Sequence, residues 1–306
     1  MKRALEAVFA LSLLLAPAAC AARFEVDGAR AHARVVHQVE AGPRIPGTPG
    51  HRVIAEWIAS ECQRLGAVVE RQAFRDSLPG RRLELVNLIA HYGPQGGRRI
   101  ALVAHWDSRP WSDQDPDSAH QADPVPGAND GGSGVAVLLE VAELLHRRQP
   151  AIGVDLVFVD GEDQGRASQP AEYCLGSKAY AAQFRNGGNP ATRPVAAFVF
   201  DMVGDRDLGI HPEGNSVAYA ANLVGIVLDA AKATGARGFS SEPRYTLTDD
   251  HLPLIEAGIP AADVIDFDYP AWHTHLDLPE RVSPESLAEV ARVAAWIVYR
   301  SPLARP

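Results

Sequence analysis

Hydrophobic and polar positions alternate along the first part of the chain in patterns that predict two helices and then two strands. Apolar residues recur at helical spacing from residue 29 to 65, but the segment GPRIPGTPG (42–50) holds three prolines and three glycines. These residues exclude a continuous helix, so two helices joined by a turn are predicted. Residues 68–74 and 83–92 alternate or are rich in β-branched side chains, which is typical of strands.

From residue 100 onward, short apolar runs alternate with longer amphipathic segments. This alternation predicts a mostly parallel sheet covered by helices. The predicted strands are 100–104, 154–159, 195–200 and 261–265. The predicted helices are 134–148, 177–184, 216–234 and 283–299. The last one has a Ser at the N-cap position followed by Pro, a typical helix start.

The chain shows no internal repeat, no long linker and no low-complexity tract, and α/β enzymes of about 300 residues commonly form one compact unit. We therefore predict an α/β fold with a single catalytic domain over residues 21–306. Its central sheet is expected to be mixed but mostly parallel, and flanked by helices.

Residues 1–20 are predicted to be an export signal and are excluded from the fold. Lys2 and Arg3 precede an apolar stretch, and small residues surround Cys20. The apolar stretch is shorter than the ~20 residues that span a bilayer. We expect an exported, periplasmic protein. Two alternatives stay open, a plain periplasmic protein and a lipoprotein attached to the membrane through lipid on Cys20.

Net charge bears on nucleic-acid binding, and the cysteine content bears on disulfide formation. The net charge is -9, with 29 Lys and Arg against 38 Asp and Glu, so a broad basic surface for nucleic acid is not expected. Beyond the signal, Cys62 and Cys174 are the remaining cysteines. An oxidising compartment could join them. The alternative, two buried thiols, is the one we favour.

Polar residues cluster directly after the predicted strands. They are His105 and Asp107, then Asp160, Glu162 and Asp163, then Asp201, and finally the segment 266–273. In an open α/β sheet, ligands bind beyond the carboxyl ends of the strands, so these side chains should converge on one crevice. Any single Asp there could be a cap or turn residue. Several strand ends together favour a zinc site of imidazole and carboxylate ligands.

Seven motifs in order carry a family resemblance. They are AHWDS (104–108), GANDGGSG (127–134), DGED (160–163), LGSKAY (175–180), FDMVG (200–204), TDDHLPL (248–254) and YPAWHT (269–274). The chain resembles the zinc aminopeptidase superfamily, and in particular its animal-type glutaminyl cyclase branch. The resemblance implies a zinc-exopeptidase-like fold, and VSPESL (282–287) extends it.

The resemblance to the cyclase branch implies a role for each of three groups of residues. One zinc ion per chain would be held by Asp130, Asp163 and His273. Glu162 would be the acid/base, with Asp249 and Asp201 forming an acidic network around the leaving nitrogen. Trp272, Tyr269 and Trp106 would wall the substrate pocket. The reaction would convert the N-terminal glutamine of peptides or proteins to pyroglutamate and release ammonia.

Two other functions stay open. In a two-zinc aminopeptidase, His105 and Asp201 would complete a second metal site with Asp130 as the bridging ligand, and Asp107 would orient His105. A noncatalytic binding domain is the other alternative, and the intact Glu162 argues against it.

The sequence departs from the cyclase pattern at the metal site, because Asp163 stands where Glu is more usual and is one methylene shorter. The acidic segment 109–127 is expected to form a solvated loop over the site; its Asp spacing lacks a complete calcium-loop pattern.

Overall fold

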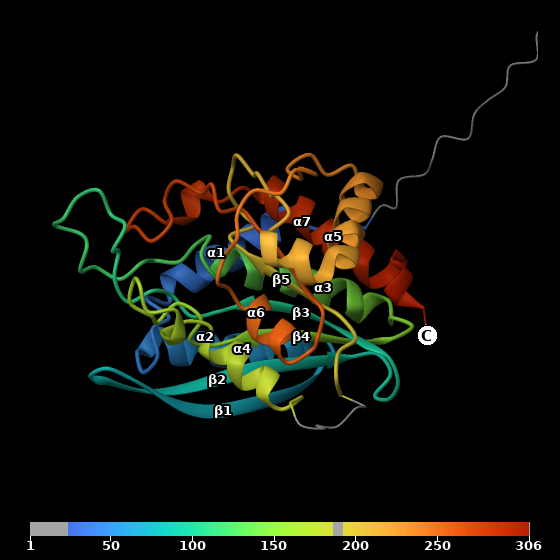
Figure 1. The fold of residues 1–306 in the computed structure, drawn as a ribbon, viewed down its shortest axis with the longest axis horizontal. Coiled ribbons are helices and arrows are strands. Elements are labelled where there is room, and N and C mark those ends of the chain that lie inside the picture. Colours follow the sequence, from blue (N-terminus) through green and yellow to red (C-terminus); the bar gives the residue numbers. More distant parts are fainter. Residues whose placement is uncertain (1–23, 186–191, 306) are drawn as a thin grey trace, which may run out of the picture.

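A computed structural model describes residues 24–185 and 192–305, which form a six-stranded sheet between two layers of helices (Figure 1). The predicted export signal and Cys20 lie outside the described residues. The strands are β1 (Val68–Leu78), β2 (Arg81–Tyr92), β3 (Arg99–His105), β4 (Gly153–Val159), β5 (Ala197–Asp201) and β6 (Ala261–Ile265). Their order across the sheet is β1-β2-β4-β3-β5-β6.

Four neighbouring strands of the sheet run in the same direction. β3 pairs in parallel with β4 on one side and β5 on the other, and β5 pairs in parallel with β6. β1 and β2 form an antiparallel hairpin at the edge, and β2 joins β4 antiparallel. The predicted mixed, mostly parallel sheet is therefore confirmed. β5 begins two residues later than predicted.

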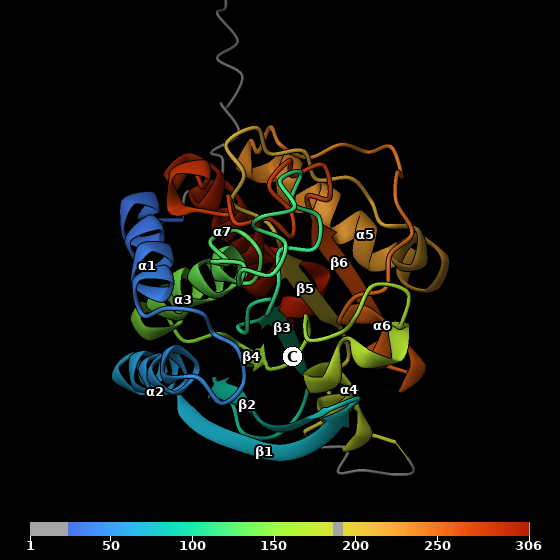
Figure 2. The same cartoon turned by 90° about the vertical axis from the view of Figure 1, so that its left-hand side faces the viewer.

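Side chains of successive strand residues point to opposite faces, and each face meets its own helices. Leu102 and Ala104 of β3 belong to the core shared with five helices, whereas Ala101 and Val103 belong to the core on the other face. The first face is covered by α1 (Gly28–Glu40), α2 (Pro49–Arg64), α3 (Gly132–Arg147), α5 (Gly214–Thr234) and α7 (Pro284–Arg300). The second is covered by α4 (Leu175–Ala182) and α6 (His251–Glu256) (Figure 2).

Capping residues explain where two of the predicted helices begin. The Thr48 side chain accepts a hydrogen bond from the backbone N–H of His51, and α2 starts at Pro49, near the end of the segment 42–50 that was predicted as the turn. Ser283 accepts from the N–H groups of the first turn of α7, as the sequence predicts. Helix α6 was not predicted, because Pro253 argues against a helix; it sits in the first turn, where no N–H is required.

Both cysteines in the described part of the chain are free and buried. Cys62 lies on the buried face of α2 and packs in the core, whereas Cys174 directly precedes α4. The favoured alternative of two buried thiols is therefore confirmed.

Candidate metal centre and its pocket

The carboxyl ends of the parallel strands bring the predicted polar residues together. His105 is the last residue of β3, Asp201 is the last of β5, and Glu162 and Asp163 follow β4. Asp130 lies in the loop before α3. These residues converge on one crevice, as the sequence predicts. Asp160, which was also expected there, is instead buried against His51, with its Oδ2 2.9 Å from Nε2 of that ring.

Asp130, Asp163 and His273 form a compact, buried set of donor atoms. Nε2 of His273 lies 3.4 Å from Oδ2 of Asp163 and 3.7 Å from Oδ2 of Asp130. One donor atom from each residue lies within 4.8 Å of the others. Tetrahedral zinc with bonds of about 2.0–2.1 Å to oxygen and nitrogen separates its donors by about 3.4 Å. The residues therefore fit a zinc ion.

The two oxygens of Asp163 have different surroundings. Oδ1 accepts a 2.5 Å hydrogen bond from Nη1 of the buried Arg109. Oδ2 is buried and makes no hydrogen bond within the described residues, although it faces His273. A buried carboxylate oxygen without a partner is costly. This orphan oxygen is explained if it binds the metal.

Arg109 and Asp113 contact two of the three candidate metal ligands, Asp163 and His273. Arg109 donates to both carboxylate oxygens of Asp113, at 2.6 and 2.9 Å. Oδ1 of Asp113 in turn lies 3.4 Å from Nδ1 of His273. A carboxylate behind a ligating imidazole fixes the orientation of its ring. The segment expected only as a solvated loop thus supports the candidate metal centre, and nothing in its sequence distinguishes these two residues from the other charged ones.

We expect Asp113→Asn to weaken zinc binding by about 10–100-fold, because it removes the carboxylate that holds the His273 ring. The dissociation constant would be measured by competition with a chromogenic chelator. Asp117→Asn is the matched control: it makes the same charge change in the same loop, where Asp117 caps only the Ala119 N–H. Equal affinities in the two variants would show that Asp113 does not support the ligand.

The backbone at His273 is in the left-handed region, with φ of 55°. A non-glycine residue rarely adopts this conformation, and such strain concentrates at functional sites. The turn places the imidazole toward Asp130 and Asp163, and stacks the Trp272 ring on it with 3.9 Å between ring centroids.

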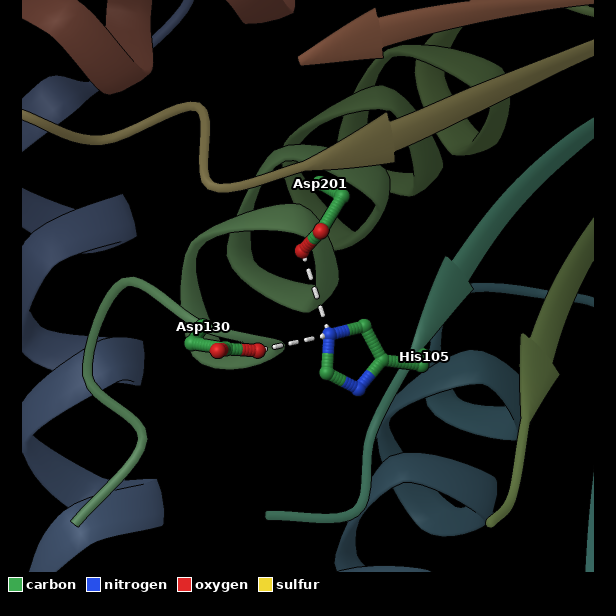
Figure 3. Close-up of side chains that lie close together, drawn as sticks. All are labelled: His105, Asp130 and Asp201. Atoms are coloured by element: carbon green, nitrogen blue, oxygen red, sulfur yellow. Dashed lines mark hydrogen bonds and ion pairs between the residues drawn. The ribbon is translucent and has the colours of Figure 1, made fainter. Parts of the chain in front are cut away.

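The second predicted metal set also comes together. Nε2 of His105 lies 3.1 Å from Oδ1 of Asp130 and 3.1 Å from Oδ1 of Asp201 (Figure 3). Asp107, which was expected to orient His105, forms an ion pair with it: its Oδ1 lies 3.5 Å from Nδ1, although that nitrogen makes no hydrogen bond within the described residues. Asp107 also accepts from the backbone N–H groups of Glu162 and Asp163, so it shapes their loop.

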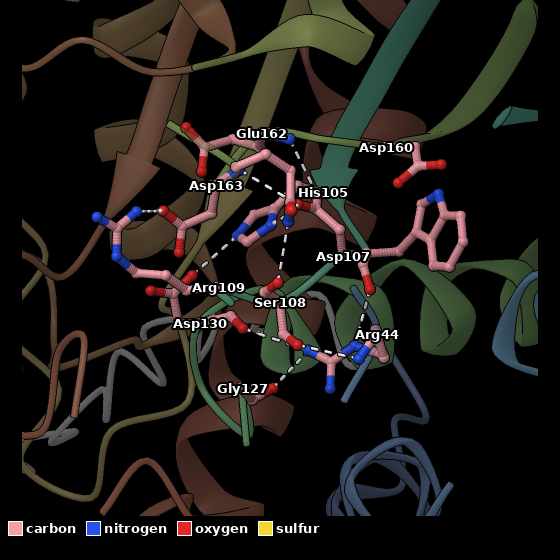
Figure 4. Close-up of polar contacts among 12 residues, drawn as sticks. Arg44, His105, Asp107, Ser108, Arg109, Gly127, Asp130, Asp160, Glu162 and Asp163 are labelled. Carbon is pink, nitrogen blue, oxygen red and sulfur yellow. Dashed lines mark hydrogen bonds and ion pairs between the residues drawn. The ribbon is translucent and has the colours of Figure 1, made fainter. Parts of the chain in front are cut away.

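The loop that carries Asp130 is fixed from two sides. Asp277 accepts hydrogen bonds from the backbone N–H of Asp130 at 3.1 Å and from the hydroxyl of Tyr269 at 2.7 Å. On the other side, the buried guanidinium of Arg44 donates to the backbone carbonyls of Trp106, Pro126, Gly127 and Asp130 (Figure 4). The position of this candidate metal ligand is thus set by the surrounding fold.

We expect Arg44→Met to lower the free energy of unfolding of the metal-free protein by about 3 kcal/mol or more, because several buried carbonyls would lose their charged donor. Urea denaturation would measure it. Arg82→Met, which removes an exposed guanidinium, is the control and should stay within about 0.5 kcal/mol of the parent. A similarly small effect at Arg44 would contradict this role.

A cavity of about 350 Å³ opens onto the metal centre. Seven of the predicted site residues line it, namely Asp130, Glu162, Asp163, Asp201, Asp249, Trp272 and His273. Residues that were not predicted also line it, among them Tyr173, Leu247 and Phe267. They come from loops whose path follows from tertiary packing, so the sequence offered no signal for them.

Two predicted pocket aromatics need correction. Trp106 is completely buried: it stacks on His51 and donates its indole N–H to the backbone carbonyl of Val86. It follows β3 on the core side, so it does not wall the cavity. Tyr269 is also outside the cavity lining, because its hydroxyl is directed to Asp277.

Burial changes the acidity of two carboxyls at the cavity. Burial, followed by the negative charge of Asp163, raises the pKa of Glu162 well above its ordinary value. Burial also raises the pKa of Asp201 to about 7; the charges of Asp249 and Asp130 add to this, while His105 opposes it. A carboxyl that can hold a proton near neutral pH is suited to acid/base chemistry.

Comparison with known proteins identifies relatives over most of the chain. A model of peptidase family M28 matches residues 87–298. The glutaminyl-peptide cyclotransferase-like protein of Bos taurus is 25% identical over 276 residues, which cover 82% of this chain and 70% of that protein.

Two solved structures superimpose closely on the fold. The glutaminyl cyclase of Tannerella forsythia has a TM-score of 0.85 and 36% identity, covering 90% of this chain and 99% of that one. A leucine aminopeptidase precursor from Bacteroides thetaiotaomicron has a TM-score of 0.85 and 34% identity, covering 90% of this chain and 98% of that one.

Proposed function

The chain belongs to peptidase family M28, and on this basis we propose that it is a zinc-dependent glutaminyl-peptide cyclotransferase. It converts the N-terminal glutamine of peptides or proteins to pyroglutamate and releases ammonia. The observation that carries the proposal is the similarity to a solved glutaminyl cyclase over 90% of the chain, with the predicted zinc ligands and Glu162 gathered at one cavity.

Asp130, Asp163 and His273 would hold the metal. Zinc bound there supplies a Lewis acid that polarises the γ-carbonyl of the substrate glutamine. We propose one zinc per chain, because the nucleophile is the α-amine of the substrate and no second metal is needed to generate hydroxide. His105 then serves to position Asp130 and Asp201 through its Nε2.

Glu162 transfers a proton from the α-amine of the substrate to the leaving amide nitrogen. It takes a proton from the attacking α-amine as the new C–N bond forms, and returns it to the amide nitrogen as the old C–N bond breaks. Ammonia leaves, and the proton count is unchanged. The raised pKa of Glu162 favours this two-way role, because the carboxylate of a strongly acidic group would be too weak a base to take the proton from the amine.

The acidic and aromatic residues of the cavity bind and orient the substrate. Asp249 and Asp201 line the cavity and would accept hydrogen bonds from the leaving nitrogen. The Trp272 ring packs on Phe267 at 4.9 Å between ring centroids. Such walls exclude water and hold the flexible glutamine side chain bent toward its own amine.

The alternative is a two-zinc aminopeptidase. Its support is the second donor set, His105, Asp130 and Asp201, together with the similarity to a leucine aminopeptidase precursor. In that reaction a water attacks the first peptide bond, and any suitable N-terminal residue would be released.

The test compares a peptide that begins with glutamine and one that begins with alanine, with products followed by mass and zinc measured on the same sample. Loss of ammonia from the glutamine peptide alone, with about one zinc per chain, supports the cyclase. Release of the first residue from either peptide, with two zinc ions per chain, would show that the protein is an aminopeptidase and would contradict the cyclase proposal.

We further propose that the protein is exported to the periplasm, from the export signal read in residues 1–20. Cell fractionation would test this, and a Cys20→Ser variant would show whether lipid attaches the protein to the membrane. Recovery in the cytoplasm would contradict export.

A further inference from the structure

Cys174 lies beside the acid/base and has no role in the reaction proposed above. Its Sγ is 3.4 Å from Oε1 of Glu162, and its backbone N–H donates to the Glu162 carbonyl at 2.9 Å. The residue is 1% exposed and its backbone is left-handed, with φ of 56°. The thiol is therefore held against the carboxyl that carries the proton.

Asp249 completes a third group of donor atoms with these two residues. One donor atom each from Glu162, Cys174 and Asp249 lies within 4.8 Å of the others. Asp249 is 4% exposed, and its Oδ2 makes no hydrogen bond within the described residues. Glu162 and Asp249 both line the cavity, so an ion that enters the cavity reaches two of the three donors directly.

The spacing of the donors fits a thiolate-binding metal. A tetrahedral zinc with bonds of about 2.3 Å to sulfur and 2.0–2.2 Å to oxygen separates these two donors by about 3.6 Å. The observed separation of Sγ and Oε1 is 3.4 Å. A sulfur ligand selects zinc and other thiophilic ions over magnesium or calcium.

The charges around the group also favour a cation. The acidic groups nearby are Glu162, Asp163, Asp249 and Asp250, all of them buried. Burial, followed by the charges of Glu162, Asp250 and Asp249, raises the pKa of the Cys174 thiol well above its ordinary value. Two cationic groups of the described chain act in the other direction: His105 lowers the pKa of Glu162, and Lys178 lowers the pKa of Cys174. A divalent ion would relieve the repulsion and release the thiol proton.

We propose that Glu162, Cys174 and Asp249 form an inhibitory site for a thiophilic divalent cation, separate from the zinc site of Asp130, Asp163 and His273. An ion bound there occupies the Glu162 carboxylate, which can then no longer move the proton. The inhibition rests on the proposed cyclase function, whereas the binding does not. Excess zinc would therefore slow the enzyme that needs one zinc ion to work.

The experiment titrates cadmium into the zinc-loaded full chain and follows two signals, the ultraviolet charge-transfer band of a cadmium–thiolate bond and the rate on a glutamine-initiated peptide. Cys174→Ser and Cys174→Ala remove the sulfur ligand. Cys62→Ala is the matched control, because it removes the other described buried thiol. Each rate is compared with that of the same variant without added cadmium, and a zinc titration is run in parallel.

We expect a saturable band and inhibition in the parent and in Cys62→Ala, at cadmium concentrations at least about tenfold lower than in either Cys174 variant. Excess zinc should inhibit with the same dependence on Cys174, and magnesium should not. Equal bands and equal inhibition in the parent and the Cys174 variants would overturn the site. If no protein acts on the peptide, the proposed function fails, and the band alone still decides whether the cation binds.

Discussion

Glu162→Gln is expected to lower kcat on a glutamine-initiated peptide by about 10²–10⁴-fold while zinc content stays unchanged. Glutamine keeps the size of the side chain but cannot take up or return the proton. The residue lies next to Asp163 but is not one of the three proposed zinc ligands, Asp130, Asp163 and His273, so the zinc at that site should remain bound. Steady-state kinetics and metal analysis on the same preparation would measure both quantities.

The matched control is Glu56→Gln, an identical change at an exposed position on α2, where Glu56 pairs with Arg71. Its kcat should equal that of the parent. A Glu162→Gln enzyme that keeps more than about a tenth of the parent rate would rule out general acid/base catalysis by this residue.

His273→Ala is expected to abolish both zinc binding and activity, with a rate loss of about 10³-fold or more, because a metal-bound carbonyl is stabilised by several kcal/mol. The remaining donors, Asp130 and Asp163, are two carboxylates beside one another, and Arg109 already engages one of them. Zinc content after dialysis and the rate on the glutamine peptide are the measurements.

The zinc content of a His105→Ala variant, compared with that of His273→Ala, distinguishes a one-zinc enzyme from a two-zinc enzyme. With one zinc per chain, this variant keeps its zinc, because His105 is not among the three ligands. In a two-zinc enzyme it would lose one of two ions. Full zinc binding in His273→Ala would contradict the assignment of the ligands.

The sequence predicts the strands around this site well, because the pattern of apolar and polar residues within each segment determines them. Alternation and β-branched residues predicted the first two strands, and apolar runs predicted the other four. Most of the polar residues that follow the parallel strands meet in the structure, because the carboxyl ends of such strands lie at one edge of the sheet. The family resemblance is confirmed by the M28 match. The roles of the individual site residues stay predictions.

Residues whose position depends on tertiary packing could not be predicted. The direction of the Trp106 ring follows from how the chain turns after β3, and it faces His51 in the core. Arg109 and Asp113 look like ordinary charged loop residues until the loop folds back onto Asp163 and His273. The closeness of Cys174 to Glu162 likewise depends on the turn before α4.

The hydrogen bond between Asp277 and the Asp130 backbone joins residues 147 positions apart along the chain. Such contacts cost loop-closure entropy and form only when the sheet is assembled, so the metal centre should appear late in folding. An unfolded or partly folded chain would then have no preformed zinc site. Zinc would bind the native state alone, and by mass action it would shield the finished protein from proteases without trapping incomplete ones.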